Sequence, residues 1–315
     1  MGSTSTGRVI SLDRSYPLVI TSQGEFRAQH SIDLVKNTDI RAAVGDFVKI
    51  ESPSGQDIPL ITTIQPRGHT LIRRSLVESL HEGAGKHNEQ ILATNIDIVF
   101  IMTAFSSRRI DLSYLERQLV MAHESGAEVV IVLSKADQAK HLDEDVTAVH
   151  EVAFESPVIV ESAVTGEGLQ QIYELVSNGK AGRTGVLLGR SGVGKSTLIN
   201  ALVGAPLLET ASVRGKDQAG RHTTVARRMV FFDEFDAFGS ALIDTPGLRS
   251  IGLYAAHIGL VAAFPDIVEQ AANCHYRDCS HTSEPGCAVL EAVASGKLPQ
   301  RRLTSFVEIA TEVNE

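Results

Sequence analysis

The stretch GRSGVGKST, residues 189–197, constrains the fold of this chain more than any other. It matches the pattern G-x-x-x-x-G-K-[ST], with an apolar run before it and the helix-like TLINALVG at its end. In that context backbone N–H groups and the lysine face phosphate oxygens, and the serine hydroxyl ligates Mg²⁺. A chance glycine-rich turn is the alternative. The phosphate-binding residues predicted here are Gly189, Arg190, Ser191, Gly192, Val193, Gly194, Lys195, Ser196 and Thr197.

The stretch SALIDTPG supplies the carboxylate that a phosphate loop needs on a neighbouring strand. Asp244 ends an apolar run and is predicted to hold Mg²⁺ through water, while Gly247 leaves a backbone N–H for the γ-phosphate. Between the two motifs lies GRHTTVARR, where Thr224, favoured over Thr223, is predicted to cover the metal. The predicted magnesium ligands are therefore Ser196, Thr224 and Asp244.

A base-reading motif occurs upstream of the phosphate loop. EVVIVLSKADQ is predicted to be a strand, 128–133, that delivers Ser134, Lys135 and Asp137 to its carboxyl end, where open α/β sheets bind ligands. The Asp137 carboxylate can accept hydrogen bonds from the ring N–H and the amine of guanine, whereas adenine would leave its charge unpaired. Lys135 can lie along the base.

A second strand, in VIVESAVTGEGL, ends near Ser162 and Ala163, whose backbone N–H can donate to the guanine carbonyl oxygen. Each short motif is weak alone, but all occur in order at strand ends. Conventional GTPases place the phosphate loop first, whereas here the base-reading motifs precede it. The chain is therefore predicted to be circularly permuted, which is possible when the original termini lay close together.

The sequence resembles, over nearly its whole length, the circularly permuted, small-ribosomal-subunit-dependent GTPases of the RsgA (YjeQ) family. The resemblance is carried by NIDIVFI, SKAD, SAVTGEGL, GRSGVGKSTLIN, GRHTT, DTPG and a cysteine cluster. The resemblance implies GTP hydrolysis to GDP and phosphate, stimulated by the 30S subunit in late assembly. Ser134 departs from the family, which usually has Asn or Thr there. This departure puts the affinity for GTP in doubt, but not the preference for guanine.

Short strand-like stretches before residue 70 predict a small β-barrel. The resemblance implies an oligonucleotide/oligosaccharide-binding (OB) barrel that contacts ribosomal RNA, and a structural barrel without a ligand is the alternative. The predicted fold is multidomain. It comprises an OB-like barrel at 1–70, a permuted α/β P-loop GTPase domain at 85–252 and a mainly helical zinc-binding domain at 253–315.

All three cysteines of the chain lie in CHYRDCSHTSEPGCAV. Cys274, Cys279, His281 and Cys287 form a C-x4-C-x-H-x5-C pattern, whose three thiolates and one imidazole suit one structural Zn²⁺. A disulfide would leave one thiol over, and free buried thiols are the other alternative. His275 is expected to lie outside the ligand set. The family places zinc at the same four positions.

The catalytic residues predicted are Lys195, Thr224 and His222. Leu248 follows DTPG where many GTPases have a water-orienting glutamine, so another group must serve. The resemblance favours His222, and a solvent-facing loop histidine is the alternative. The basic stretch 214–228, with Arg214, Lys216, Arg221, Arg227 and Arg228, is predicted either to contact RNA or to form a solvated face.

The net charge of −9 argues against general nucleic-acid binding, so any RNA contact must be local. With no secretory signal or membrane-length apolar run, the protein is expected to be cytoplasmic and without a membrane partner. It is also expected to be a monomer. Its expected partners are GTP or GDP with Mg²⁺, and the 30S subunit with its rRNA. Because of Ser134, an RNA-binding assembly scaffold with a degenerate nucleotide site is an alternative function. Asp137 opposes an ATP-dependent kinase or transporter-type ATPase.

Overall fold

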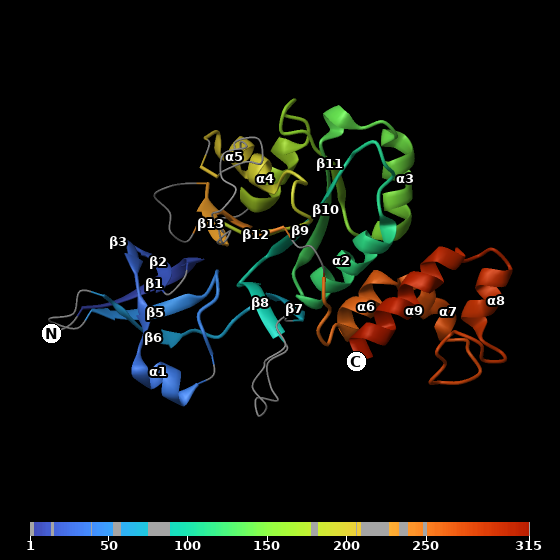
Figure 1. The fold of residues 1–315 in the computed structure, drawn as a ribbon, viewed down its shortest axis with the longest axis horizontal. Helices are drawn as coiled ribbons and strands as arrows, with labels where there is room; N and C mark the ends of the chain where they lie inside the picture. The colour runs from blue at the N-terminus through green and yellow to red at the C-terminus, as the bar shows by residue number, and fades with distance from the viewer. Residues whose placement is uncertain are drawn as a thin grey trace, which may run out of the picture.

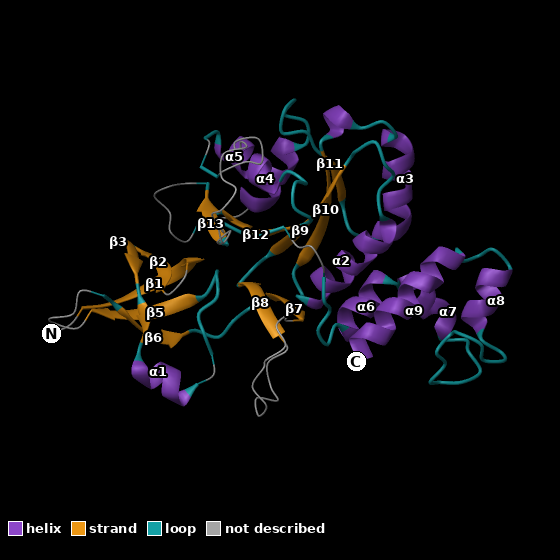
Figure 2. Cartoon of the chain, in the orientation of Figure 1, coloured by secondary structure: helices purple, strands orange, loops and turns teal. Residues whose placement is uncertain are grey.

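Figures 1 and 2 show the chain in a computed structural model, with the N-terminal barrel, the central α/β region and the C-terminal helices following one another across the view. The structure describes residues 3–13, 16–38, 40–52, 58–74, 89–177, 182–205, 207–208, 227–232, 239–247 and 251–314. None of the helices formed by these residues has the length and apolar character needed to cross a bilayer.

The N-terminal region is a small OB-like β-barrel, as predicted (Figure 2). The long first strand pairs antiparallel with both the second and the fifth. Alternate residues point inward, so Val9, Val19, Val48 and Ile61 form an apolar centre with no exposed surface. Its elements are β1 (Ser3–Asp13), β2 (Tyr16–Thr21), β3 (Gly24–Arg27), β4 (Gln29–His30), α1 (Ile32–Asn37), β5 (Phe47–Ser52) and β6 (Leu60–Ile64).

The central region is a sheet with strand order β11-β10-β9-β12-β14-β13, parallel except for β13. Strand β9 is apolar on both sides, since Phe100 packs in one buried cluster and Ile101 in another. Helices therefore cover both faces of this sheet (Figure 1). The strands are β9 (Ile98–Ala104), β10 (Glu128–Ser134), β11 (Val158–Val160), β12 (Thr184–Leu188), β13 (Arg228–Phe231) and β14 (Ala241–Asp244).

Described helices pack on both faces of the sheet. Leu115 and Val149, from α2 and α3, join the cluster of Ile101, whereas Ile172 and Leu198, from α4 and α5, join that of Phe100. The helices are α2 (Leu112–Glu124), α3 (Leu142–Ala153), α4 (Leu169–Ser177) and α5 (Lys195–Val203).

The strand order shows how the permutation is accommodated. Strand β9 comes first in the chain among these strands, yet it lies in the middle of the sheet, between β10 and β12. The base-reading motifs thus follow β10 and β11, and the phosphate loop follows β12, with all their carboxyl ends at one edge because the strands are parallel. The predicted fold class, a circularly permuted α/β domain between a barrel and a helical region, is confirmed.

A buried arginine joins the barrel to the central sheet. Arg8 on β1 is 2% exposed, and its guanidinium donates to the carbonyl oxygens of Gly45 and Asn95 and to Oγ1 of Thr184, the last at 2.8 Å. Burial lowers the pKa of Arg8 to about 10, against the attraction of Asp97. Ser11 of β1 also pairs with Arg228 of β13, so the two sheets are continuous.

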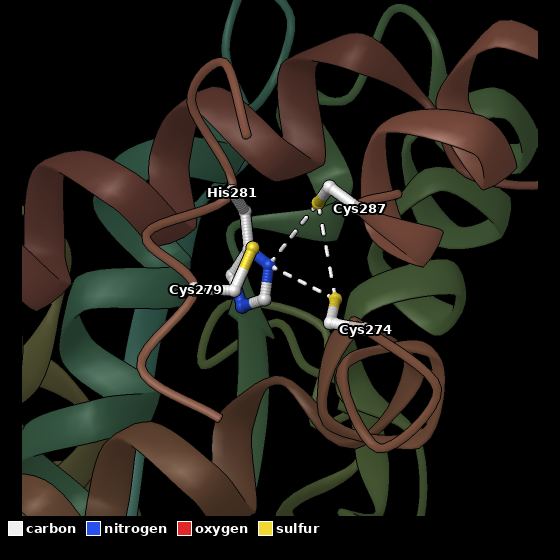
Figure 3. A group of neighbouring side chains, drawn as sticks. All are labelled: Cys274, Cys279, His281 and Cys287. Atoms are coloured by element: carbon white, nitrogen blue, oxygen red, sulfur yellow. Dashed lines mark hydrogen bonds between the residues drawn. The ribbon is translucent and has the colours of Figure 1, made fainter. Parts of the chain in front are cut away.

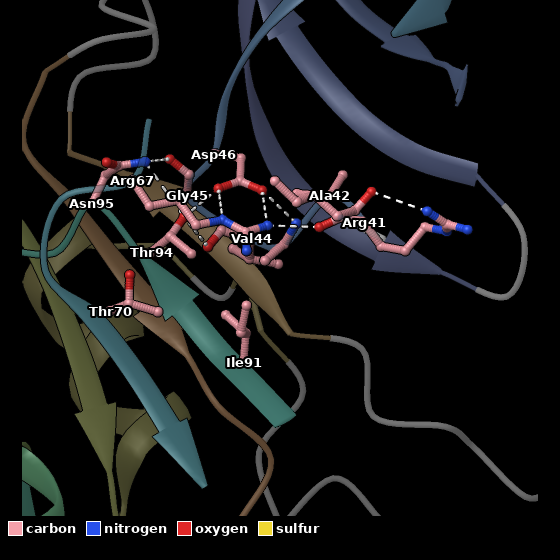
Figure 4. Close-up of polar contacts among 12 residues, drawn as sticks. Arg41, Ala42, Val44, Gly45, Asp46, Arg67, Thr70, Ile91, Thr94 and Asn95 are labelled. Carbon is pink, nitrogen blue, oxygen red and sulfur yellow. Dashed lines mark hydrogen bonds and ion pairs between the residues drawn. The ribbon is translucent and has the colours of Figure 1, made fainter. Parts of the chain in front are cut away.

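A second polar contact lies beside this joint (Figure 4). The Asp46 carboxylate has no exposed surface and takes two 2.8 Å hydrogen bonds from Arg67 and one, also of 2.8 Å, from Oγ1 of Thr94. Thr94 ends β8 (Glu89–Thr94), which pairs with β7 (Thr70–Arg74) in a separate two-stranded sheet. The barrel is therefore fixed to the strand pair that precedes β9.

The C-terminal helices pack against the central region through α2, next to which α6 and α9 lie (Figure 1). Glu116 of α2 has no exposed surface and accepts from Arg301 and Arg302 of α9, at 2.9 and 2.8 Å. Arg302 also pairs with Asp266, at 2.9 Å. These helices are α6 (His257–Ala263), α7 (Pro265–Ala271), α8 (Ala288–Ala294) and α9 (Gln300–Asn314).

Candidate nucleotide site and metal centre

The predicted phosphate loop joins β12 to α5. Gly194 precedes the helix with a φ of 105°, a left-handed conformation that glycine adopts without strain. Lys195 is the first residue of α5 and is 6% exposed. Its Nζ donates to the carbonyl oxygens of Gly189 and Arg190, at 3.0 and 3.1 Å. The lysine ammonium is thus folded against the backbone of the phosphate loop.

Burial lowers the pKa of Lys195 from its ordinary value, and the nearby Asp244 carboxylate opposes this shift. The ammonium therefore lies in a partly desolvated place beside an acidic group. Phosphate oxygens would offer this cation stronger partners than the two carbonyl oxygens it now contacts.

The two predicted magnesium ligands of the described chain meet directly. Oγ of Ser196 donates to Oδ2 of Asp244 across 2.8 Å, although 48 residues separate them. A hydroxyl and a carboxylate are oxygen ligands of the kind that Mg²⁺ takes in phosphate sites. The donor set therefore fits this metal.

Gly247 comes directly against the phosphate loop. A Cβ on this residue would lie 2.4 Å from Cα of Ser191, which no real side chain tolerates. Only glycine therefore allows the DTPG backbone to approach the loop this closely.

The turn after β10 contacts the phosphate loop through two side chains. Oγ of the buried Ser134 donates to the carbonyl oxygen of Val193 at 2.6 Å, and Nζ of Lys135 donates to that of Gly192 at 2.6 Å. Lys135 has a left-handed backbone, with a φ of 63°, which is uncommon outside glycine. The structure thus brings the predicted base-reading turn and the phosphate loop together across 57 to 59 residues of sequence.

Asp137 and Ser162 come from adjacent strand ends and are hydrogen-bonded to each other. Oγ of Ser162 donates to Oδ1 of Asp137 at 2.7 Å. Ser162 is buried and Asp137 is exposed, so the carboxylate is oriented by the serine and still open to a ligand. Ala163 follows Ser162 directly.

Sequence reasoning missed Glu161, the residue before Ser162. It is 2% exposed and its Oε1 has no hydrogen-bond partner. Burial raises its pKa to about 7, the Asp137 carboxylate adds to the shift, and a hydrogen bond from the Ala163 backbone opposes it. The sequence held only one signal, a charged residue where a short apolar strand ends.

Other predicted residues lie around this site or outside the described residues. Arg190 is half exposed, pairs with Asp111 at 3.1 Å and stacks on the Tyr114 ring at 3.7 Å from its centre, whereas Thr197 is exposed on α5. Arg227, in the basic stretch, donates to the carbonyl oxygen of Ile91, and Arg228 is exposed. The residues predicted in this region that lie outside the described part of the chain are Arg214, Lys216, Arg221, His222, Thr223, Thr224 and Leu248.

The structure also gathers the four predicted zinc ligands, Cys274, Cys279, His281 and Cys287 (Figure 3). Their ligand atoms all lie within 4.8 Å of one another. Nδ1 of His281 is 3.6 Å from Sγ of Cys274 and 3.4 Å from Sγ of Cys287, and these two sulfur atoms are 3.9 Å apart. A tetrahedral zinc site has edges of about 3.6 to 3.8 Å.

The surroundings favour the ligating forms of His281 and Cys274, whereas burial raises the pKa of the Cys279 thiol to about 12. Burial lowers the pKa of His281, despite the attraction of Glu284, and so favours neutral imidazole. Burial opposes ionisation of Cys274, but hydrogen bonds from the backbone of Val289 and Ala288, together with those of the neighbouring cysteine side chains, lower the pKa of the thiol. A metal site at this cluster is therefore chemically consistent. His275 lies outside the group of four, as predicted.

A carboxylate organises the loop that carries two of the ligands. Glu284 accepts hydrogen bonds from the backbone N–H and the hydroxyl of Ser280, at 2.7 and 2.5 Å. It also accepts from the backbone N–H groups of Thr282 and Ser283. Glu284 therefore holds the chain on both sides of His281, whose φ of 58° is left-handed.

A phosphate loop after β12, a Ser196–Asp244 pair and base-reading turns that precede both in the chain define a circularly permuted P-loop GTPase. The sequence profile of the family described as RsgA GTPase matches residues 64–254. The chain belongs to the RsgA GTPase family. The resemblance seen in the sequence, and with it the assignment as a GTP-hydrolysing enzyme, is confirmed.

Curated relatives agree over most of the chain. A protein of Streptomyces avermitilis named "Small ribosomal subunit biogenesis GTPase RsgA" is 39% identical, over 97% of this chain and 79% of its own. A Streptomyces coelicolor protein of the same name is 40% identical, over 97% and 80%. One from Methanosarcina acetivorans is 39% identical, over 86% and 69%.

Two solved structures share the fold. YjeQ from Thermotoga maritima superposes with a TM-score of 0.68 at 22% identity, over 99% of both chains. YloQ, described as a circularly permuted GTPase, superposes with a TM-score of 0.64 at 22% identity, over 99% of this chain and 96% of its own.

Proposed function

We propose that this GTPase hydrolyses GTP to GDP and phosphate during late assembly of the small ribosomal subunit, and that the subunit stimulates it. The observation that carries the GTP site is the 2.8 Å contact of Ser196 with Asp244. The role in assembly is supported by the names of relatives that match almost the whole chain. A ribosomal role supports a cytoplasmic location, and we propose that the protein acts as a monomer.

Each group in the site has a definite task in the proposed reaction. Lys195 exchanges its two carbonyl partners for phosphate oxygens, and Ser196 and Asp244 hold Mg²⁺, which offsets charge on the phosphates. The loop residues from Gly189 to Thr197 and the backbone of Gly247 surround the phosphates. No covalent intermediate is required, because positioning and charge stabilisation are sufficient.

Guanine is proposed to lie at the turns after β10 and β11. Asp137, held by Ser162, accepts from the ring N–H and the amine, and the backbone N–H of Ala163 donates to the carbonyl oxygen. Lys135 lies along the base and Ser134 fixes the turn on the phosphate loop. The contact of Ser134 with the phosphate loop supports an intact nucleotide site rather than a degenerate one.

His222 is proposed to orient the attacking water, and Thr224 to close over the metal. Contacts of partner RNA with the basic residues of stretch 214–228, of which the described Arg228 is exposed, would bring His222 toward the attacking water. The barrel at 1–70 is proposed to bind rRNA, next to the GTPase domain at 85–252. The domain at 253–315 is proposed to hold one structural Zn²⁺ on Cys274, Cys279, His281 and Cys287.

GTP and ATP turnover, with and without 30S subunits, tests this function. We expect GTP hydrolysis that rises several-fold or more with subunits, and no comparable ATP hydrolysis. His222→Ala should keep nucleotide binding and the basal rate but lose roughly 10²-fold of the stimulated rate. His150→Ala, on the exposed surface of α3, is the matched control. Equal turnover of ATP and GTP, or a stimulated His222→Ala protein, contradicts the respective assignment.

A further inference from the structure

Glu161 is a buried carboxyl group directly behind the proposed guanine subsite. Its backbone N–H donates to the carbonyl oxygen of Leu133, and its own carbonyl oxygen accepts from Ala136. These bonds, of 2.8 and 3.0 Å, fix it between the two base-reading turns. The side chain is 2% exposed and Oε1 has no hydrogen-bond partner.

No cation compensates this carboxyl within the described residues, where no ion pair of Glu161 occurs. The ammonium of Lys135, on the neighbouring turn, is bonded to Gly192, and the hydroxyl of Ser162 is given to Asp137. The nearby charge that acts on Glu161 is the Asp137 carboxylate. Glu167, on the following turn, is exposed. Ionising a buried carboxyl beside another carboxylate is costly, so burial and charge together favour its neutral form.

A backbone donor links Glu161 to the proposed position of the base. The Ala163 N–H, proposed to donate to the guanine carbonyl oxygen, is the group that favours the charged form of Glu161. An ionised Glu161 would therefore compete for this N–H. It would also place a negative charge near Asp137 and near the carbonyl oxygen of the base, both of which repel it.

We propose that Glu161 is a positioning residue of the guanine subsite that must be neutral for tight nucleotide binding, so that binding weakens as this carboxyl ionises. The inference rests on the proposed function, since it requires guanine at Asp137 and Ala163. A pKa raised to about 7 places the change near neutral pH. Affinity is then highest in slightly acidic solution and falls as the pH rises through 7.

The test measures dissociation constants of a fluorescent GDP for the full chain at about pH 6.5 and about pH 8.0, where a required neutral carboxyl with a pKa near 7 gives a weakening of up to about eightfold. Glu161→Gln and Glu161→Thr, which cannot ionise, should lack this part of the pH dependence. Glu167→Gln, in the same turn but exposed, is the matched control and should keep it. Comparison between proteins at each pH cancels titration of the nucleotide phosphates.

A wild-type profile steeper than that of both neutral variants supports the inference. Parallel profiles for the wild type and both variants overturn it, as does a variant profile that is steeper than the wild type. Two neutral side chains of different size guard against misfolding, because a folding defect would weaken binding at both pH values without changing the slope. Absence of GDP binding by the wild type at either pH would instead contradict the proposed function.

Discussion

The hydroxyl of Ser134 donates a 2.6 Å hydrogen bond to the carbonyl oxygen of Val193 and thereby links the base-reading turn to the phosphate loop. Ser134→Ala removes a buried donor and leaves that carbonyl oxygen without it, at a cost of roughly 1–2 kcal/mol, or about 5- to 30-fold in GTP affinity. Ser134→Thr keeps a hydroxyl and should lose less. Titration with fluorescent GTP distinguishes the variants, and an Ala variant that binds as tightly as the Thr variant contradicts this role.

Asp137→Asn should reverse the choice of base. The asparagine amide would donate where the carboxylate accepts, so it favours xanthine, whose carbonyl oxygen replaces the guanine amine. We expect weaker GDP binding and stronger binding of xanthosine diphosphate. Competition between the two nucleotides measures the change. Unaltered preference for GDP would show that Asp137 does not contact the base.

Ser196→Ala removes a hydroxyl that contacts Asp244 and is proposed to ligate Mg²⁺. A lost metal ligand in a phosphate site should lower GTP turnover by roughly 10²-fold. The dependence of the rate on magnesium concentration should shift to higher concentrations. Thr147→Ala, an exposed hydroxyl on α3, is the control. Identical magnesium dependence in Ser196→Ala and the control argues against this metal site.

Glu284→Gln should loosen the zinc loop without removing a ligand. The carboxylate accepts four hydrogen bonds from Ser280, Thr282 and Ser283, and an amide can accept at only one of its two terminal atoms. Partners outside the ligand set typically change metal affinity about 10- to 100-fold. Zinc content of the purified protein and zinc transfer to a chromogenic chelator measure the effect. Glu291→Gln, exposed in the first turn of α8, is the control.

Zinc should be present at one per chain in protein purified without a chelator. If Glu284→Gln and Glu291→Gln transfer zinc to the chelator at the same rate, Glu284 does not stabilise the zinc loop, but the assignment of the four ligands is unaffected. Protein without zinc would contradict the metal assignment itself.

Glu161 should also make the stability of the GTPase domain depend on pH. The pKa of Glu161 in the folded protein is about 7, above the ordinary value of 4.5. As the pH rises, the unfolded state therefore loses the Glu161 proton at a lower pH than the folded state. The contribution of the neutral Glu161 to the free energy of unfolding is complete below pH 4.5. It is lost as the pH rises towards 7, and the loss is at most about 3 kcal/mol. Relative to the wild type, Glu161→Gln should therefore gain stability over this range. Urea unfolding of both proteins at several pH values measures the difference, and a constant difference contradicts it.

Local patterns were sufficient to predict the strand ends and the residues they carry. The conformations of the apolar run 128–133 and of the loop around Lys195 are each set by residues close together in sequence. Their residue types alone therefore predicted a strand and a phosphate loop. Arg8 could not be interpreted in this way, because its partner Thr184 is 176 residues away. The burial of Glu161 was equally hidden, since it results from the packing of β10 against β11.

The joint between the barrel and the sheet sets an order of events during protein synthesis. Strand β1 is among the first residues made, but the pairing partner of Ser11 is Arg228, and Arg8 reaches Thr184. Translation must therefore proceed past β12 before the guanidinium obtains this hydroxyl, and past β13 before the two sheets join. The edge of β9 that pairs with β12 likewise has no partner strand until β12 has been synthesised. The base-reading half of the domain is therefore synthesised before β9 can obtain its partner β12 and before the phosphate loop has left the ribosome.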